Sequence, residues 1–197
     1  MRRPDAQPAM PSPSSSRATG LPLEAVAAMV VVVVASNWLV QFPINDWLTW
    51  GAFSYPMAFL VSDLTNRWYG PARARQVALV GFAIGVVLSY LLSDARIALA
   101  SGLAFLSSQL LDITIFDRMR RASWWKAPLV GSVLASTWDT AVFFSGAFAF
   151  TGLPWISWAI GDLAVKLAMA LVLLVPFRAI MNLRAPVPGA TPPLPSS

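Results

Sequence analysis

The sequence predicts an all-α integral membrane protein with six transmembrane helices, and three observations support this. First, 57% of the 197 residues are hydrophobic and only 12% are charged, about half the charged fraction of a typical soluble domain. Second, apolar segments recur at lengths that suit a bilayer, where a spanning helix needs about 20 residues. Third, basic residues alternate between the two sides of these segments. Together they place the chain in a membrane.

The residues that the chain lacks exclude several kinds of chemistry. It contains no cysteine and no histidine. Disulfides, Cys/His metal sites, thiol nucleophiles and imidazole acid–base catalysis are therefore excluded, and we expect neither a cofactor nor a metal. The formal charge is +5, but the basic residues flank apolar segments and report membrane topology rather than nucleic-acid binding.

Both ends of the chain are rich in proline and polar residues. Residues 1–21 and residues 185–197, "APVPGATPPLPSS", have too few apolar side chains to pack. We predict that they form disordered cytoplasmic tails around one transmembrane domain at residues 22–184.

The transmembrane domain is predicted to contain six apolar segments, of which the second is the shortest. The third segment contains Gly81 and Gly85, a spacing that favours close packing against a neighbouring helix. In chain order the segments are 23–42, 52–68, 74–93, 97–116, 127–150 and 155–178.

The orientation follows from the basic residues in the connections. Arg96 is the one basic residue in the loops on one side. The opposite side holds twelve, which predicts that this side and both termini are cytoplasmic. These twelve are Arg2, Arg3, Arg17, Arg67, Arg73, Arg75, Arg118, Arg120, Arg121, Lys126, Arg178 and Arg184.

Polar residues inside the segments fall at helical spacings that place them on one face of each helix. Such residues are expensive in lipid and turn toward a common interior. We therefore predict a substrate-binding interior, and a gating or coupling role for Asp63 and Arg67. The candidate binding residues are Asn37, Gln41, Gln109, Asp112, Trp138, Asp139, Asp162 and Lys166.

Asp139 and Lys166 are predicted to lie at similar depth and to pair. Each is twelve or thirteen residues from a cytoplasmic basic residue, which corresponds to roughly 18–20 Å along a helix. This pair could be purely structural, as could an i, i+4 pair of Asp63 with Arg67. However, one lysine cannot neutralise four intramembrane acids, so some acids are protonated or face a wet cavity.

The available side chains suit a flat polar ring. A guanine-type heterocycle presents adjacent N–H donors, which a carboxylate can accept, and a carbonyl that Gln, Asn or Lys can bond. Trp138, beside Asp139, could stack on such a ring, with ordinary helix packing as the alternative reading. Chemistry alone does not separate a purine from another polar ring.

Three stretches of the sequence together resemble a known transporter family. They lie at about 36–75, 104–150 and 159–183, and include "WGAFSYPMAFLVSDLTNRWYG" and "GDLAVKLAMALVLLVPF". In this order they are similar to the queuosine precursor transporter family, also called the vitamin uptake transporter family.

The resemblance implies a six-helix importer in the cell inner membrane. The fold would resemble the substrate-binding subunits of energy-coupling-factor transporters. The cargo would be 7-cyano- or 7-aminomethyl-7-deazaguanine, used to make queuosine in tRNA, with another vitamin-like or purine-like polar ring as the alternative. The chain has no nucleotide-binding loop. An ion gradient, metabolic trapping and a separate energising subunit all stay open, as does homo-oligomerisation.

A membrane-embedded enzyme and a scaffold are the competing classes. A rhomboid-type protease needs histidine, and a metalloprotease needs ligands that this chain lacks. The single "GD" at 161–162 is poor support for an aspartyl intramembrane protease, and a scaffold would not explain five ionisable groups at depth. We therefore expect a transporter and no enzymatic activity.

Overall fold

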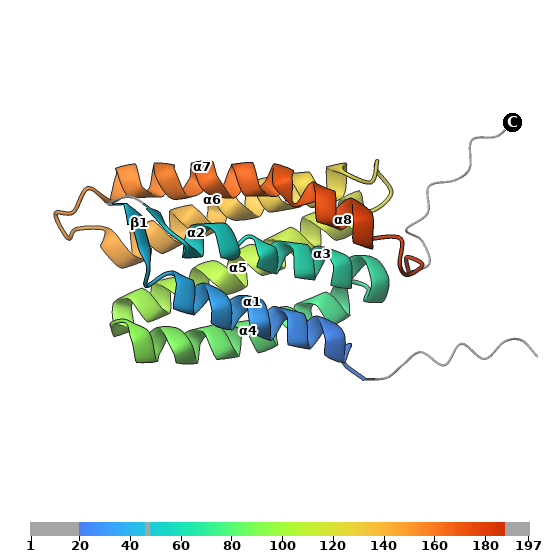
Figure 1. Cartoon of the computed structure of the whole chain (residues 1–197), viewed down its shortest axis with the longest axis horizontal. Helices are drawn as coiled ribbons and strands as arrows, with labels where there is room; N and C mark the ends of the chain where they lie inside the picture. Colours follow the sequence, from blue (N-terminus) through green and yellow to red (C-terminus); the bar gives the residue numbers. More distant parts are fainter. Residues whose placement is uncertain (1–19, 46–47, 188–197) are drawn as a thin grey trace, which may run out of the picture.

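The computed structural model describes residues 20–45 and 48–187, and it is a bundle of long helices (Figure 1). The predicted disordered tails lie almost wholly outside the described residues. In chain order the elements are α1 (Leu23–Leu39), β1 (Pro43–Asn45), β2 (Leu48–Thr49), α2 (Gly51–Ser54), α3 (Met57–Tyr69), α4 (Pro71–Leu92), α5 (Ala95–Met119), α6 (Lys126–Phe148), α7 (Trp155–Val172) and α8 (Leu174–Ile180).

Two of the six predicted segments are each divided into two helices, and each division lies beside a proline. Pro56 separates α2 from α3, and its backbone has no N–H to donate to a preceding turn. The division between α7 and α8 falls at Leu173. Pro176 follows three residues later, where its ring crowds the carbonyl of Val172. The other four segments each match one helix.

Within the described residues, four helical stretches are long and apolar enough to cross a membrane: Pro71–Leu92, Ala95–Met119, Lys126–Phe148 and Trp155–Ile180. Helix α1 is apolar but has only 17 residues, and α3 has 13. At 1.5 Å per residue, these two fall short of a hydrocarbon core of about 30 Å. The structure is that of a multi-pass helical membrane protein.

The chain segment between α1 and α2 contains a short antiparallel hairpin at one end of the bundle. In this hairpin, Pro43 of β1 pairs with Thr49 of β2, and Asn45 pairs with Leu48. The hairpin lies at the opposite end of the bundle from α8 (Figure 1). It therefore helps to enclose the space between α1 and α7 at that end.

The bundle is apolar outside and holds many polar side chains inside. Large exposed side chains such as Leu79, Leu91 and Leu103 cover its surface, whereas Asn66, Gln109 and Asp112 are fully buried. This is the reverse of a soluble protein and is expected where lipid is the solvent.

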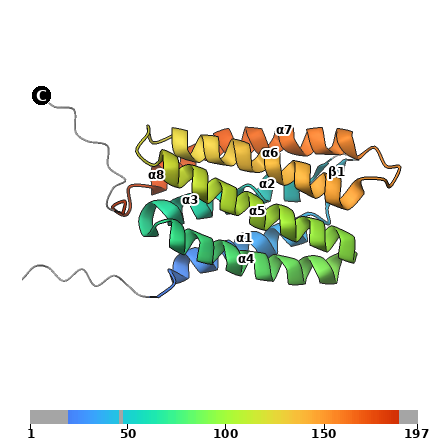
Figure 2. The ribbon, with the colours of Figure 1, turned by 180° about the vertical axis from the view of Figure 1, so that it is seen from behind.

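Small residues bring the helices close together. Helix α5 lies in the middle of the bundle, packed against α3, α4 and α6, as both views show (Figures 1 and 2). A Cβ at Gly81 would lie 2.8 Å from Cγ of Met29, and one at Gly85 would lie 3.4 Å from Cγ1 of Val33. The predicted close packing at these two glycines is confirmed, and the neighbour is α1.

Gly131 of α6 provides a test of this packing. A Cβ there would lie 2.5 Å from Oδ1 of the buried Asp112. We expect Gly131→Ala to lower the free energy of unfolding by about 1–3 kcal/mol, because overpacking displaces its neighbours. Thermal unfolding of the purified protein in detergent measures this.

Gly161→Ala is the matched control, since a Cβ at Gly161 meets nothing within 4 Å. Its midpoint should stay the same or rise slightly. Equal midpoints for the two variants would contradict the packing of α5 against α6 described above.

Candidate functional site

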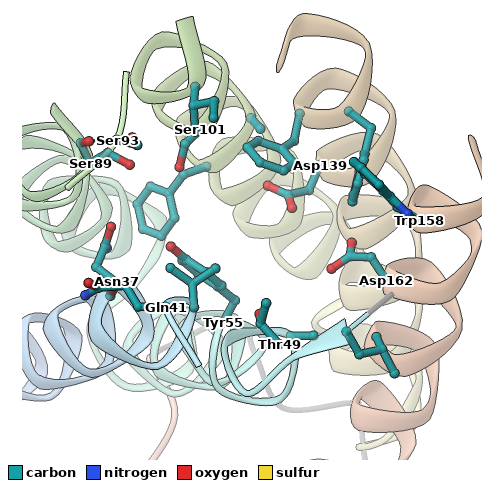
Figure 3. A pocket seen from close by; sticks show the side chains of 18 of the residues that line it. Asn37, Gln41, Thr49, Tyr55, Ser89, Ser93, Ser101, Asp139, Trp158 and Asp162 are labelled. Carbon is teal, nitrogen blue, oxygen red and sulfur yellow. Dashed lines mark hydrogen bonds between the residues drawn. The ribbon is translucent and has the colours of Figure 1, made fainter. Parts of the chain in front are cut away.

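The bundle encloses a cavity of about 650 Å³ near the end that carries the hairpin (Figure 3). Its wall combines the last turns of α1, the hairpin, α2, the end of α4, the start of α5, the second half of α6 and the first half of α7. The polar lining residues are Asn37, Gln41, Asn45, Thr49, Tyr55, Ser89, Ser93, Ser101, Asp139, Asp162 and Lys166.

The strongest interaction in this wall is an ion cluster between α6 and α7. Nζ of Lys166 lies 2.7 Å from Oδ2 of Asp139 and 2.5 Å from Oδ2 of Asp162. The lysine side chain is only 6% exposed. Asp162 and Lys166 are one turn apart on α7, and Asp139 reaches them from α6. Lys166 therefore binds both acids rather than one of them.

Hydroxyl groups complete the cluster. Oγ1 of Thr140 donates to Oδ2 of Asp162 at 2.9 Å and accepts from Nζ of Lys166 at 3.3 Å. Oγ of Ser108 on α5 donates to Oδ1 of Asp139 at 3.2 Å. The cluster thus connects α5, α6 and α7, and fixes both carboxylates at the cavity wall.

Aromatic rings form the apolar part of the wall. Trp158 meets Phe148 edge-on, with 5.7 Å between ring centroids, and Phe143 meets Phe144 at 5.1 Å. Tyr55 projects into the cavity between the amide side and the carboxylate side (Figure 3). A flat ring entering this space would have aromatic surface available for stacking.

Five of the predicted site residues come together at this cavity: Asn37, Gln41, Asp139, Asp162 and Lys166. Trp138 does not line it. This side chain is 50% exposed, and its indole nitrogen donates to Oγ of Ser107 at 3.0 Å.

Sequence reasoning did not assign Tyr55, Ser89, Ser93, Ser101 and Trp158 to the site. Two signals were available for part of this set. Trp158 shares a helical face with Asp162 and Lys166, and Tyr55 directly precedes the proline that divides α2 from α3.

Gln109, Asp112 and Asp63 form a second buried cluster, nearer to the end of the bundle that carries the termini. Oγ of Ser62 donates to Oε1 of Gln109 at 2.5 Å. The carboxyl groups of Asp63 and Asp112 are neighbours, and each residue is 2% exposed or less. Within residues 20–45 and 48–187, no cation pairs with either acid.

Further polar contacts lie beside this second cluster, on the side away from the cavity. Nδ2 of Asn66 donates to the carbonyl of Ile113 at 2.9 Å, and Arg120 donates to Oδ1 of Asn66 at 2.6 Å. Arg67 does not pair with Asp63. Instead, Nε of Arg67 donates to the carbonyl of Met181 at 3.2 Å, after the end of α8.

In the part of the chain that the structure describes, no group of three or more Asp or Glu side chains could hold a metal ion. The cavity offers instead two carboxylates, one ammonium, amides and hydroxyls, which suit the hydrogen bonding of a polar organic molecule.

A helical membrane bundle around a cavity of this size, with a carboxylate–lysine cluster in its wall, fits a membrane protein of the solute-transporting class. The family model described as "Putative vitamin uptake transporter" matches residues 49–95 and 89–181. The chain belongs to this family. It is a transporter and not an enzyme.

Curated relatives agree with the family. The Queuosine precursor transporter of Escherichia coli is 32% identical, and the match covers 77% of this chain and 82% of that protein. The "Probable queuosine precursor transporter" of Haemophilus influenzae is 31% identical, with 75% and 80% covered. A protein of the same name in Bacillus subtilis is 27% identical, with 63% and 67% covered. No solved structure matches this chain.

Lys166→Met tests the ion cluster. The change leaves two partly buried carboxylates without a cation, and removing one partner of a buried ion pair costs about 3–5 kcal/mol, which is an upper bound here. We expect a clear fall in the thermal unfolding midpoint of the purified protein.

The triple variant Lys166→Met, Asp139→Asn, Asp162→Asn carries no unpaired charge, so it should recover most of that stability. If the single variant unfolds at the wild-type temperature, the cluster does not hold the three helices together.

Proposed function

We propose that this chain imports a queuosine precursor, 7-cyano- or 7-aminomethyl-7-deazaguanine, across the cell inner membrane for queuosine synthesis in tRNA. The observation that carries the proposal is the carboxylate pair around Lys166, exposed at the wall of a 650 Å³ cavity. A 7-deazaguanine ring combines the N–H donors, the carbonyl and the flat apolar faces that this wall can bind.

Several lining residues then have a proposed role. Asp162 supplies an acceptor for an N–H group of the ligand, while Lys166 holds the carboxylates of Asp162 and Asp139 in place. Asn37 and Gln41 offer amide groups that can both donate and accept. Tyr55 and Trp158 provide aromatic surface, a role that the sequence assigned to Trp138. A different vitamin-like or purine-like ring is the second candidate, since these groups do not depend on one ring alone.

The second buried cluster supports a proposed gating or coupling role. Gln109 and Asp112 lie beyond the part of α5 that lines the cavity, and Asp63 and Asn66 of α3 pack beside them. We therefore place the inner gate at this cluster, with Asp63 and Arg67 on the helix that would move.

For topology, we propose six membrane passages with both termini in the cytoplasm. In this arrangement, α2 and α3 together cross the membrane once, and α7 and α8 together cross it once. The described basic residues support this orientation, because Arg67, Arg120 and Arg178 lie at the end of the bundle opposite Arg96. The cavity then lies in the outer half of the membrane. The expected likeness to energy-coupling-factor substrate-binding subunits stays a prediction.

Reporter fusions test the topology. Fusions after residue 95 and after residue 153 should give the external signal, and a fusion after residue 122 should give the cytoplasmic signal. A cytoplasmic signal from the fusion after residue 95 or from the fusion after residue 153 would contradict the six-passage arrangement.

Salvage of queuosine tests the transported molecule. In cells that cannot make the precursor, loss of this chain should abolish queuosine in tRNA at low external precursor. Mass spectrometry of digested tRNA provides the measurement. Re-expression of the wild type or of Arg184→Ala should restore the modification, because Arg184 lies outside the cavity.

Unchanged queuosine after the deletion, in cells without another importer, would contradict this function. Uptake of a labelled ring that is not a 7-deazaguanine would then favour the second candidate.

A further inference from the structure

The two carboxylates at the cavity wall are not equivalent. Asp139 has a partner on each oxygen. Lys166 donates to Oδ2, and the hydroxyl of Ser108, which is shared with the carbonyl of Phe105 at 3.0 Å, lies 3.2 Å from Oδ1. Asp162 accepts from both Lys166 and Thr140 on Oδ2. Among residues 20–45 and 48–187, nothing donates to its Oδ1. Asp162 therefore offers a free acceptor to the cavity, whereas Asp139 is already used by the protein.

The cavity also carries an excess of negative charge. Of its described lining residues, only Asp139, Asp162 and Lys166 are charged, which leaves a net charge of −1. The other helices and the hairpin contribute neutral amides, hydroxyls and aromatic rings, of which Tyr55 is the one further titratable group. An uncompensated carboxylate in a site of low dielectric attracts a positive charge far more strongly than it would in water.

The free oxygen and the neutral polar groups lie on different sides of the cavity. Figure 3 shows Asn37 and Gln41 across the space from Asp139 and Asp162, with Tyr55 between them. A ligand that spans the cavity would thus meet a carboxylate at one end and amides at the other. Amides match the edge of a 7-deazaguanine ring that lies opposite its 7-substituent, because that edge has a donor in the 2-amino group and an acceptor in N3.

We propose that the cavity selects a cationic ligand, whose ammonium group binds Oδ1 of Asp162 while the opposite edge of its ring, which carries the 2-amino group and N3, faces Asn37 and Gln41. This inference rests on the proposed function and chooses between its two precursors. The aminomethyl form carries a primary ammonium at neutral pH, and the cyano form is neutral. Only the first balances the charge of the cavity, so the protein prefers 7-aminomethyl-7-deazaguanine.

Calorimetric binding of each precursor to the purified full-length protein at pH 7 tests the preference. We expect the aminomethyl form to bind about tenfold or more tightly than the cyano form, as a close charge pair in a desolvated site implies. In Asp162→Asn, Lys166 keeps Asp139 as its partner and the cavity becomes neutral. The ratio of the two affinities should fall to about threefold or less, mainly through weaker binding of the aminomethyl form.

Asp117→Asn is the matched control. Asp117 pairs with Arg120 near the end of α5, remote from the cavity, at an Oδ1–Nη2 distance of 2.5 Å. This variant removes the same charge elsewhere, and the affinity ratio should equal that of the wild type.

The possible outcomes separate the two proposals. Equal affinities in the wild type, or an unchanged ratio in folded Asp162→Asn, would overturn the cation preference and leave the proposed function standing. If the purified protein binds neither precursor, both the cation preference and the proposed function are contradicted. If Asp162→Asn does not fold, the cation preference is tested on the wild type instead, by comparing its affinity for the aminomethyl form with its affinity for neutral 7-methyl-7-deazaguanine. The methyl compound keeps the ring and lacks the charge. Tenfold weaker binding of the methyl compound would support the inference.

Discussion

The structure depends on one buried ammonium group held between two carboxylates. Lys166 is the single positive charge among the described residues of the cavity wall, and it binds Asp139 across the contact between α6 and α7 and Asp162 within α7. Bringing three charges together inside a bilayer is unfavourable unless they pair and their remaining lone pairs are hydrogen-bonded. Ser108 and Thr140 supply most of those bonds. Among the described residues, no group donates to Oδ1 of Asp162, and this oxygen is therefore the acceptor that the cavity offers to a ligand.

Packing by small residues makes such a polar interior possible. Lipid provides no hydrophobic force between helices, so close backbone approach and interhelical hydrogen bonds hold them together. The buried apolar residues are largely alanines, including Ala74, Ala78, Ala104 and Ala135, while the large aliphatic side chains face outward. Gly131 and Gly146 allow α6 to approach Asp112 and Ala100 of α5. The contact at Gly131 borders the second buried cluster, which includes Asp112.

The sequence predicted the helical membrane class and much of the ion cluster, because both follow from local patterns. Residue spacing along a helix places Asp162 and Lys166 on one face, and depth counted from the basic ends places Asp139 opposite them. Residue spacing alone could not show which helices turn their polar faces toward the same cavity. Gln109 and Asp112 lie on a polar face like the others, but they are about one and two turns beyond Phe105, the last residue of α5 that lines the cavity. The position of Tyr55 depends on the break at Pro56, and Trp138 turns outward to Ser107, a tertiary contact that no periodicity reveals.

An experimental structure with a bound precursor tests the central claim most directly, namely that the Lys166 cluster presents Asp162 to the ligand. The account predicts a ligand nitrogen within about 2.7–3.2 Å of Oδ1 of Asp162, with Nζ of Lys166 still bonded to both carboxylates. A ligand bound elsewhere in the bundle, or a Lys166 that leaves the two acids to bind the ligand itself, would contradict it.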